Sequence, residues 1–534
     1  MILELFKISD YIGIIVSIIL LYVAKFYYQY FTRTNPLPGP IPLPLIGNSL
    51  QMIYYVKGDM VDYYKFLHQR YGDIYELYIG NFRQVVLARP EYIEKLMSTS
   101  KQSHNVLRVG KTGLEDLGLG PMKGIAFNTY IPTWKSNRQF LLHTIQIPNF
   151  SNEVMYNTSK TFDELNSYWK SIGYGVPIDF VNWARLLTYE LVFQIIMGFK
   201  INKLVEYFND NVEVSKKKDF RPSSLDKEIT NLHESILENL PGLMFVLSYP
   251  SFIRRTLFKK KNDAMFYNKH RTNEMLSKII NYRRKEIEET PINEELRNDM
   301  LTTLIITNTE RDFNEKHYIA NESSEPLTND QILQILIEAV AGGSDSIAHF
   351  LCFVVYYLGH YPNVLARFRQ ELDLILGSDP NRQITTDDLS KMHYLDALIK
   401  ESARFINQTK IIQRVSTSTS EVAGYKWSPD TTFIIYVEGI HLNPNYYKNP
   451  HEFNPDRFMG DKPQKNTFLM FGGGMRTCPG KKFALTEVKC LITLIFRSLD
   501  VSLVDKNAPV KLMNAFTTSC TELMVKINQR EVQI

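Results

Sequence analysis

The most apolar stretch of the chain lies near its N-terminus. From Tyr11 to Phe31 the sequence reads YIGIIVSIILLYVAKFYYQYF, a run of 21 residues with one charge, at Lys25. As a helix this run would be roughly 31 Å long at about 1.5 Å per residue, which is enough to cross a bilayer. Lys25 lies near one end, where its side chain can reach the interface. The pattern predicts a membrane-spanning helix, and a buried core helix is the alternative.

The residues around this run set its expected orientation. No small-residue cleavage site is evident, so we expect an uncleaved anchor. Lys7 precedes the run beside two acidic residues, whereas Lys25 and Arg33 mark its other end. The positive-inside rule then leaves the C-terminal bulk in the cytoplasm, by a margin of one charge. Five prolines from Pro36 to Pro44 favour a stiff spacer, with an ordinary loop as the alternative.

The remaining apolar positions follow a mostly helical period, interrupted by two strand-rich segments. Tyr71–Ala88 contains two β-rich runs around Gly80-Asn81, which predicts a hairpin. Residues 411–437 are strand-rich as well. Helices are expected from about Pro132, from Thr328 to about His360, from Leu395 to Phe405 and from Pro479 to about Leu499, with surface loops and helices at 202–261 and a polar loop at 308–325. The predicted fold is therefore mainly α with small β-sheets.

The longest of these helices has clear boundary signals. Thr328 is a favourable N-cap, Gln331 completes a capping box three residues later, and Pro362 ends the pattern. A helix of more than about thirty residues is far above the mean length for globular proteins. We therefore expect it to traverse the core.

Composition narrows the class of protein. The chain has 534 residues, of which 44% are hydrophobic and 22% charged, so disorder and collagen-like repeats are excluded. Its net charge of +4 is too small to indicate a nucleic-acid partner. The four cysteines show no CxxC or metal-finger spacing, which argues against a secreted disulfide framework and for a reducing compartment.

One cysteine stands in a setting suited to chemistry. Phe471–Gly480 reads FGGGMRTCPG, which places Cys478 between a glycine-rich loop and the start of a helix. The helix N-terminus and free backbone N–H groups stabilise a thiolate there. A single thiolate suits an iron that already has four other ligands, as in haem, and Arg476 is within reach of a cofactor carboxylate. The alternative is a buried structural cysteine in a turn.

This segment resembles the haem-binding loop of the cytochrome P-450 family, of the eukaryotic microsomal type. The fixed positions of the family pattern are matched by Phe471, Gly474, Arg476, Cys478 and Gly480. The resemblance implies the cytochrome P-450 fold, with Cys478 as the axial ligand of heme b and the other four positions binding the cofactor. It also implies two parts, a membrane anchor at 1–34 and a haem-thiolate catalytic domain at 35–534.

A structural triad is implied in the same way. Glu401 and Arg404 lie at i and i+3 on one helix face, a pair that alone has no diagnostic value. The family joins such a pair to an arginine in a segment like Phe453–Phe458, where this chain has Arg457. Loss of one partner from a buried triad should be severe.

The glycine pair in the long helix marks a second candidate region. Residues 341–346 read AGGSDS, and each mid-helix glycine costs roughly 1 kcal/mol relative to alanine. The glycines favour either ligand access to the backbone or close helix packing. Asp345 beside Ser346 offers proton delivery, and the family has an acid followed by threonine at these positions. Serine keeps the hydroxyl and lacks the methyl that stiffens the threonine rotamer.

Three further residues resemble cofactor-binding positions of the family. Trp134 and Arg138 lie at i and i+4, so both can point toward one carboxylate, and they match the family's W-x-x-x-R pair. Arg414 lies where the family has another arginine that binds a haem propionate. The prolines usual before that arginine are replaced by Asn407, Gln408 and Thr409, which allows the alignment to shift by one residue.

The resemblance implies a monooxygenase that inserts one oxygen atom from O2 into a lipophilic small molecule. Electrons are expected from an NADPH-dependent diflavin reductase, docked near Lys481, Lys482 and Lys489 unless these lysines are simply a solvated face. The expected location is the endoplasmic reticulum membrane, with a single span and a cytoplasmic catalytic domain. Segments 101–127 and 202–261, which line the substrate pocket in the family, match nothing fixed, so the substrate stays open. A haem-thiolate isomerase or dehydratase and a non-enzymatic haem sensor are the alternatives.

Overall fold

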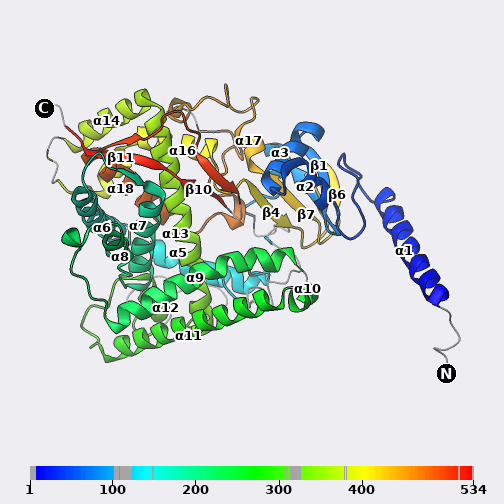
Figure 1. Ribbon diagram of the computed structural model, residues 1–534, viewed down its shortest axis with the longest axis horizontal. Helices are drawn as coiled ribbons and strands as arrows, with labels where there is room; N and C mark the ends of the chain where they lie inside the picture. Colours follow the sequence, from blue (N-terminus) through cyan, green and yellow to red (C-terminus); the bar gives the residue numbers. More distant parts are fainter. Residues whose placement is uncertain are drawn as a thin grey trace.

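The structure is a computed structural model in which one long helix projects from a mainly helical body (Figure 1). It describes residues 8–100, 107–108, 123–146, 150–249, 251–307, 309–312, 326–377, 379, 382–460, 462–514 and 517–531. The expectation of a mainly α fold with small sheets is confirmed. The predicted polar loop at 308–325 lies outside the described residues except for 309–312, and the same holds for most of segment 101–127.

The helices occupy most of the predicted positions. In chain order they are α1 (Ile8–Phe31), α2 (Ser49–Val56), α3 (Met60–Tyr71), α4 (Pro90–Ile93), α5 (Ile131–Gln146), α6 (Phe150–Ile172), α7 (Phe180–Met197), α8 (Lys203–Asp210), α9 (Ser224–Ser248), α10 (Ser251–Thr256), α11 (Lys259–Glu289), α12 (Met300–Ile306), α13 (Asn329–His360), α14 (Pro362–Leu376), α15 (Thr386–Lys391), α16 (His393–Phe405), α17 (Val437–His441) and α18 (Lys481–Ser498). The segment at 202–261 is largely helical, in α8, α9 and α10.

Helix α13 runs through the middle of the helical body and packs along α7 (Figure 1). Its start has the predicted capping box: the Gln331 N–H donates to Thr328 Oγ1 at 3.3 Å, and the Thr328 N–H donates to Gln331 Oε1 at 3.0 Å. The helix is long and apolar enough to span a membrane, but most of its apolar window is buried. It is therefore a core helix, as the sequence predicted.

The strands form four small sheets. The largest has the order β1 (Ile74–Ile79), β2 (Phe82–Leu87), β7 (Thr432–Tyr436) and β4 (Ile411–Val415). The others are β3 (Pro177–Asp179) with β11 (Met524–Gln529) and β8 (Leu499–Leu503), β9 (Lys511–Asn514) with β10 (Thr518–Glu522), and β5 (Ser420–Val422) with β6 (Tyr425–Trp427). Ile79 pairs with Phe82, so Gly80-Asn81 is the turn of the predicted hairpin. The strand-rich reading of 411–437 is also confirmed.

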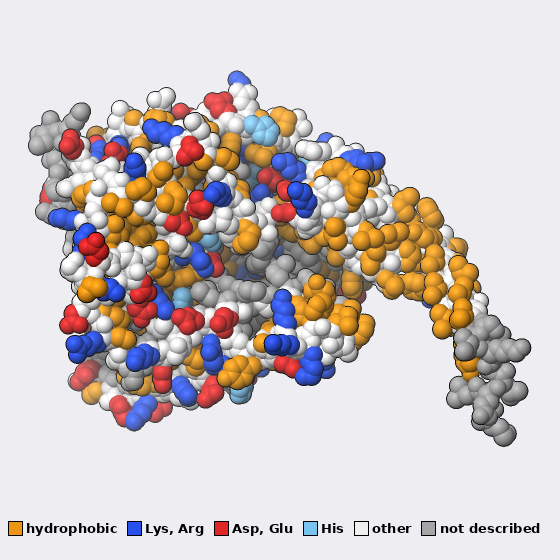
Figure 2. Space-filling model, viewed as in Figure 1, with side chains coloured by type: hydrophobic (Ala, Val, Ile, Leu, Met, Phe, Trp, Pro, Cys, Tyr) orange, Lys and Arg blue, Asp and Glu red, His pale blue; other side chains and the backbone are white. Residues whose placement is uncertain are grey.

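Helix α1 differs from the others because its apolar side chains are exposed along its length (Figure 2). Leu21, for example, is 71% exposed. A helix with this surface is a candidate for membrane anchoring. Its end is held to the hairpin, where Arg33 and Arg83 both pair with the buried carboxylate of Glu76.

Candidate functional site

The loop that carries Cys478 leads directly into α18. The Cys478 N–H donates to the Phe471 carbonyl at 2.9 Å, which closes the loop on itself. Gly474 has φ +65°, and an added Cβ there would lie 2.8 Å from the backbone carbon of Met97. Only glycine suits this position, because a side chain would be strained and would strike backbone. At Gly480 an added Cβ would lie 4.0 Å from Cys478 Sγ, so the sulfur sits close to the helix start.

Opposing effects act on the thiol of Cys478. Burial raises the pKa of the Cys478 thiol, whereas a hydrogen bond from the Gly480 backbone and the charges of Arg108 and Arg138 act in the opposite direction. A cation bound to the sulfur would offset the cost of burial, because it favours the thiolate strongly. The site therefore suits a metal-bound thiolate better than a free one.

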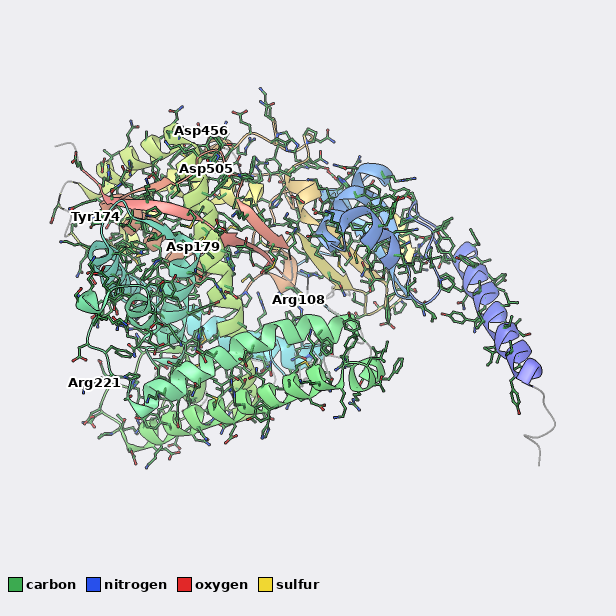
Figure 3. All side chains as sticks on the ribbon, viewed as in Figure 1. Arg108, Tyr174, Asp179, Arg221, Asp456 and Asp505 are labelled. Atoms are coloured by element: carbon green, nitrogen blue, oxygen red, sulfur yellow. The ribbon has the colours of Figure 1, made fainter. Side chains whose placement is uncertain are left out.

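Three arginines from other parts of the chain donate to this loop, which itself carries a fourth, Arg476. Arg138 of α5 donates to the Thr477 carbonyl at 2.7 Å, and Arg108 donates to the Arg476 carbonyl at 3.1 Å. Arg414 of β4 donates to the Gly473 carbonyl at 3.3 Å. In the view of Figure 3, Arg108 appears between the four-stranded sheet and α9, and its side chain is half-buried. The structure thus brings Arg138, Arg414 and Arg476 together around Cys478, and it adds Arg108.

The electrostatics of this cluster favour a dianionic ligand. Burial and the neighbouring guanidinium groups of Arg108, Arg414 and Arg138 lower the pKa of Arg476 to about 8. Burial and Arg108 lower the pKa of Arg414 to about 9. The Arg476 guanidinium lies 3.9 Å above the ring of Trp134, whose buried indole N–H has no acceptor among the described residues. Donors of this kind fit the two carboxylates of a haem, so the residues present suit that cofactor.

A half-buried glutamate of α13, Glu338, lies on one side of this cluster. Glu338 accepts hydrogen bonds from the Ala126 N–H at 2.9 Å and from the Ile125 N–H. The same short segment accepts the Arg476 guanidinium, at the carbonyls of Ile125 and Asn128, both at 2.9 Å. Burial raises the pKa of Glu338, while the two backbone N–H groups and Arg108 oppose that shift. Glu338 therefore links α13 to the arginine that precedes Cys478.

A second charge cluster lies at the end of α16. Glu401 is fully buried and pairs with Arg404 at 2.7 Å and with Arg457 at 3.0 Å. Arg404 also donates to the carbonyls of His441 and Pro450, at 3.0 and 2.8 Å. This network ties α16 to the segment that leads to the Cys478 loop.

The two neighbouring glycines of α13, Gly342 and Gly343, have different surroundings. An added Cβ at Gly342 would meet nothing within 4 Å, whereas at Gly343 it would lie 3.6 Å from Val192. Gly342 thus fits the ligand-access alternative and Gly343 the packing alternative. The Ser346 hydroxyl donates to the Gly342 carbonyl at 2.7 Å. Asp345 faces α7, where Arg185 and Tyr189 bind its carboxylate.

Sequence reasoning missed several residues of this site. Arg108, Glu338 and Tyr189 belong to no motif and were not identified. Gln408 was noted only as a residue that replaces a proline usual in the family. Its amide donates to the Ser346 carbonyl. The sequence gives one local indication for Arg108 and Glu338, which is that each is a charged residue within an apolar stretch. This indication does not predict which residue either side chain contacts. Of the three lysines considered for docking, Lys481 and Lys482 are exposed, whereas Lys489 pairs with Asp396.

Comparison with known proteins identifies cytochrome P450 relatives. A family model described as Cytochrome P450 matches residues 37–528. Probable cytochrome P450 4e1 of Drosophila melanogaster is 25% identical over 482 residues, covering 88% of this chain and 82% of that protein. The (S)-1-hydroxy-N-methylcanadine 13-hydroxylase CYP82X2 of Papaver somniferum is 24% identical over 561 residues, covering 98% and 95%. The crystal structure of cytochrome P450DA heme domain has TM-score 0.73 at 19% identity, covers 93% of this chain and 99% of its own, and shows a shared fold.

Proposed function

This chain belongs to the cytochrome P450 family and is a P450 monooxygenase, and from that premise we propose how its own residues serve the reaction. Membership implies a haem-thiolate cofactor, a substrate, O2 and a redox partner. The observation that carries the assignment of residues is the convergence of Arg108, Arg138 and Arg414 on the loop that carries Arg476 and the least buried of the four thiols, Cys478. We assign residues 1–34 to the anchor and 35–534 to the catalytic domain.

The proposed cofactor is heme b, with Cys478 as its axial ligand. Trp134, Arg138, Arg414 and Arg476 would bind its carboxylates, together with Arg108. When bound, the cofactor supplies activation of dioxygen, and thiolate ligation favours cleavage of the O–O bond. Phe471, Gly474 and Gly480 shape the loop around the sulfur. The triad of Glu401, Arg404 and Arg457 holds the segment that leads to this loop.

Asp345 and Ser346 are proposed to deliver protons during the reaction. Insertion of one oxygen atom into a C–H bond consumes one O2, two electrons and two protons, and releases one water. The Ser346 hydroxyl lies beside Gly342, where the backbone is open to a ligand. Its hydroxyl can pass a proton, and the carboxyl group of Asp345 is the neighbouring group that can exchange one.

The N-terminal apolar helix supports membrane anchoring, and the proposed location is the endoplasmic reticulum, with α1 as a single span. Further exposed apolar side chains follow α1 in the chain, at Ile41, Leu45, Ile53 and Tyr54. A second exposed apolar group consists of Phe252 in α10 and Leu257 just after it. Three lysines, at positions 259–261, follow this group in the chain. Surfaces of this kind rest in a membrane interface, so the body should touch the lipid surface as well.

The proposed electron donor is an NADPH-dependent diflavin reductase. Lys481 and Lys482 are exposed at the start of α18, directly after the Cys478 loop, and positive charge there suits an acidic partner. Lys489 is less suited to this role, because its side chain is 14% exposed and pairs with Asp396. The proposed substrate is a lipophilic small molecule, because the anchored domain meets such molecules at the membrane.

The experiment that tests the assignment is the replacement of the thiol. Cys478→Ser should lack the red-shifted Soret band of the ferrous carbonyl form. Cys490→Ser, at a buried cysteine of α18, is the matched control and should keep the band. Persistence of the band in Cys478→Ser would mean that another residue is the ligand. Loss of turnover without added reductase, with recovery on its addition, would separate a monooxygenase from an isomerase.

A further inference from the structure

The segment at residues 123–128, here called the strap, is fixed to the long core helix. Glu338 of α13 accepts the N–H groups of Ile125 and Ala126 at one carboxyl oxygen, Oε2. Gly124 has φ +68°, and an added Cβ there would strike the carboxyl group of Glu338. Glycine is therefore needed where the strap meets this side chain.

The other side of the strap holds Arg476. Its guanidinium donates to the carbonyls of Ile125 and Asn128, both at 2.9 Å. Ile125 therefore lies between two partners, because its N–H donates to Glu338 and its carbonyl accepts from Arg476. The guanidinium also lies 3.9 Å above the ring of Trp134. These contacts set the position of the Arg476 guanidinium.

A third contact ties the strap to α5. The buried amide of Asn137, which directly precedes Arg138, donates to the Gly124 carbonyl at 3.0 Å. Glu338 lies one turn before Gly342, so the strap borders the face of α13 that is open to a ligand. The strap is therefore held by three of the elements that surround the proposed cofactor site.

From this arrangement we propose that the strap is a clasp that retains the cofactor, and that Glu338 holds the clasp closed. The inference rests on the proposed binding of the haem carboxylates by Arg476. Release of the cofactor requires Arg476 to move, and Arg476 is bound to the strap. The hydrogen bonds to Glu338 therefore add to the barrier for release. Glu338 acts through the strap and Arg476, and it is a positioning residue.

The proposed role depends on an acceptor oxygen and not on a negative charge. Both backbone N–H groups meet the same oxygen of Glu338, so the single carbonyl oxygen of a glutamine can replace it. Leucine is of similar size but has no acceptor, so it leaves both N–H groups without the oxygen that they bind. Glu338→Gln and Glu338→Leu therefore separate hydrogen bonding from charge.

The test measures the transfer of haem from the full-length holoprotein to an excess of apomyoglobin, followed by the change in the Soret band. The variants are Glu338→Leu, Glu338→Gln, Gly124→Ala and the double variant of Glu338→Leu with Gly124→Ala. Arg476→Gln is the positive control. Glu190→Leu is the matched control, because Glu190 of α7 also accepts two consecutive backbone N–H groups, at 2.9 and 3.1 Å. Unfolding midpoints of the same proteins are measured alongside.

We expect Glu338→Leu to lose haem about 10-fold faster than wild type, because two hydrogen bonds to a carboxyl group are removed. Gly124→Ala should also lose haem faster. The double variant should be no faster than the faster single variant, because both changes detach the same strap. Glu338→Gln should match wild type. Glu190→Leu should lower the unfolding midpoint and leave the rate of haem transfer unchanged.

The proposal is wrong if Glu338→Leu transfers haem at the wild-type rate, or if Glu338→Gln is as fast as Glu338→Leu. It is also wrong if Glu190→Leu releases haem as fast as Glu338→Leu, because the effect would then be a general loss of stability. If Glu338→Leu does not fold with haem, Gly124→Ala decides in the same way. Wild-type transfer in Arg476→Gln would instead mean that this arginine does not bind the cofactor, so the proposed assignment fails and the clasp fails with it.

Discussion

A buried carboxyl of α18 gives a sharp prediction about stability and pH. Glu487 is fully buried, and neither of its carboxyl oxygens meets a donor among the described residues. Burial raises the pKa of Glu487 to about 8. In the unfolded chain the same group is solvated and ionises near its ordinary value of 4.5. Between these two values the folded protein holds one proton more than the unfolded chain.

The sign of the effect follows from this difference in bound protons. The free energy of unfolding falls as pH rises from about 4.5 to about 8, and it stops falling above the folded pKa. Each pKa unit corresponds to about 1.4 kcal/mol, so the loss between about pH 5 and pH 8 is on the order of 3 kcal/mol. Glu487→Gln has nearly the same shape and cannot ionise. Its advantage over wild type should therefore grow with pH across this range.

The assay is denaturant unfolding of the holoprotein at several pH values from about 5 to 9, which spans the two pKa values. Glu213→Gln, at an exposed glutamate, is the control and should track wild type at every pH. The quantity of interest is the difference in unfolding free energy between Glu487→Gln and wild type. A difference that stays constant with pH, or that shrinks as pH rises, would refute the reasoning. It would mean that Glu487 is ionised and paired in the folded protein.

Three other outcomes are expected. Glu401→Gln leaves the buried Arg404 guanidinium without its counter-charge and should cost about 3–5 kcal/mol in denaturant unfolding, so a loss below about 1 kcal/mol would contradict a buried triad. Deletion of residues 1–31 should release the protein at least partly from sedimented membranes and keep the haem spectrum, whereas loss of haem would assign the segment to the core. Ser346→Ala should keep haem and form less product and more peroxide per reducing equivalent, while Ser346→Thr should couple as well as wild type or better; unchanged coupling in Ser346→Ala would leave Ser346 a packing role.

Features that depend on neighbouring residues could be read from the sequence. The capping box of Thr328 and Gln331 starts α13 because the two side chains bond to backbone within one turn. Gly80-Asn81 sets the β1–β2 register because a two-residue turn admits few conformations. The Cys478 loop is similarly local, since Gly474 must adopt a positive φ beside it. The apolar run of α1 could be identified because length and hydrophobicity alone set its ability to span a bilayer.

Tertiary structure decided which distant groups meet. Arg108 and Glu338 join the site from segments that have no motif, because chain folding brings them to Arg476. Asp345 was readable as an acid beside an alcohol, but its contacts with Tyr189 depend on how α13 packs along α7. The sequence predicted Lys489 as one of three surface charges, whereas in the fold it forms an ion pair with Asp396. The burial of a side chain and the pairing of its charge depend on all the residues packed around it. The spacing of residues in the sequence does not specify these neighbours, so only the folded structure determines both properties.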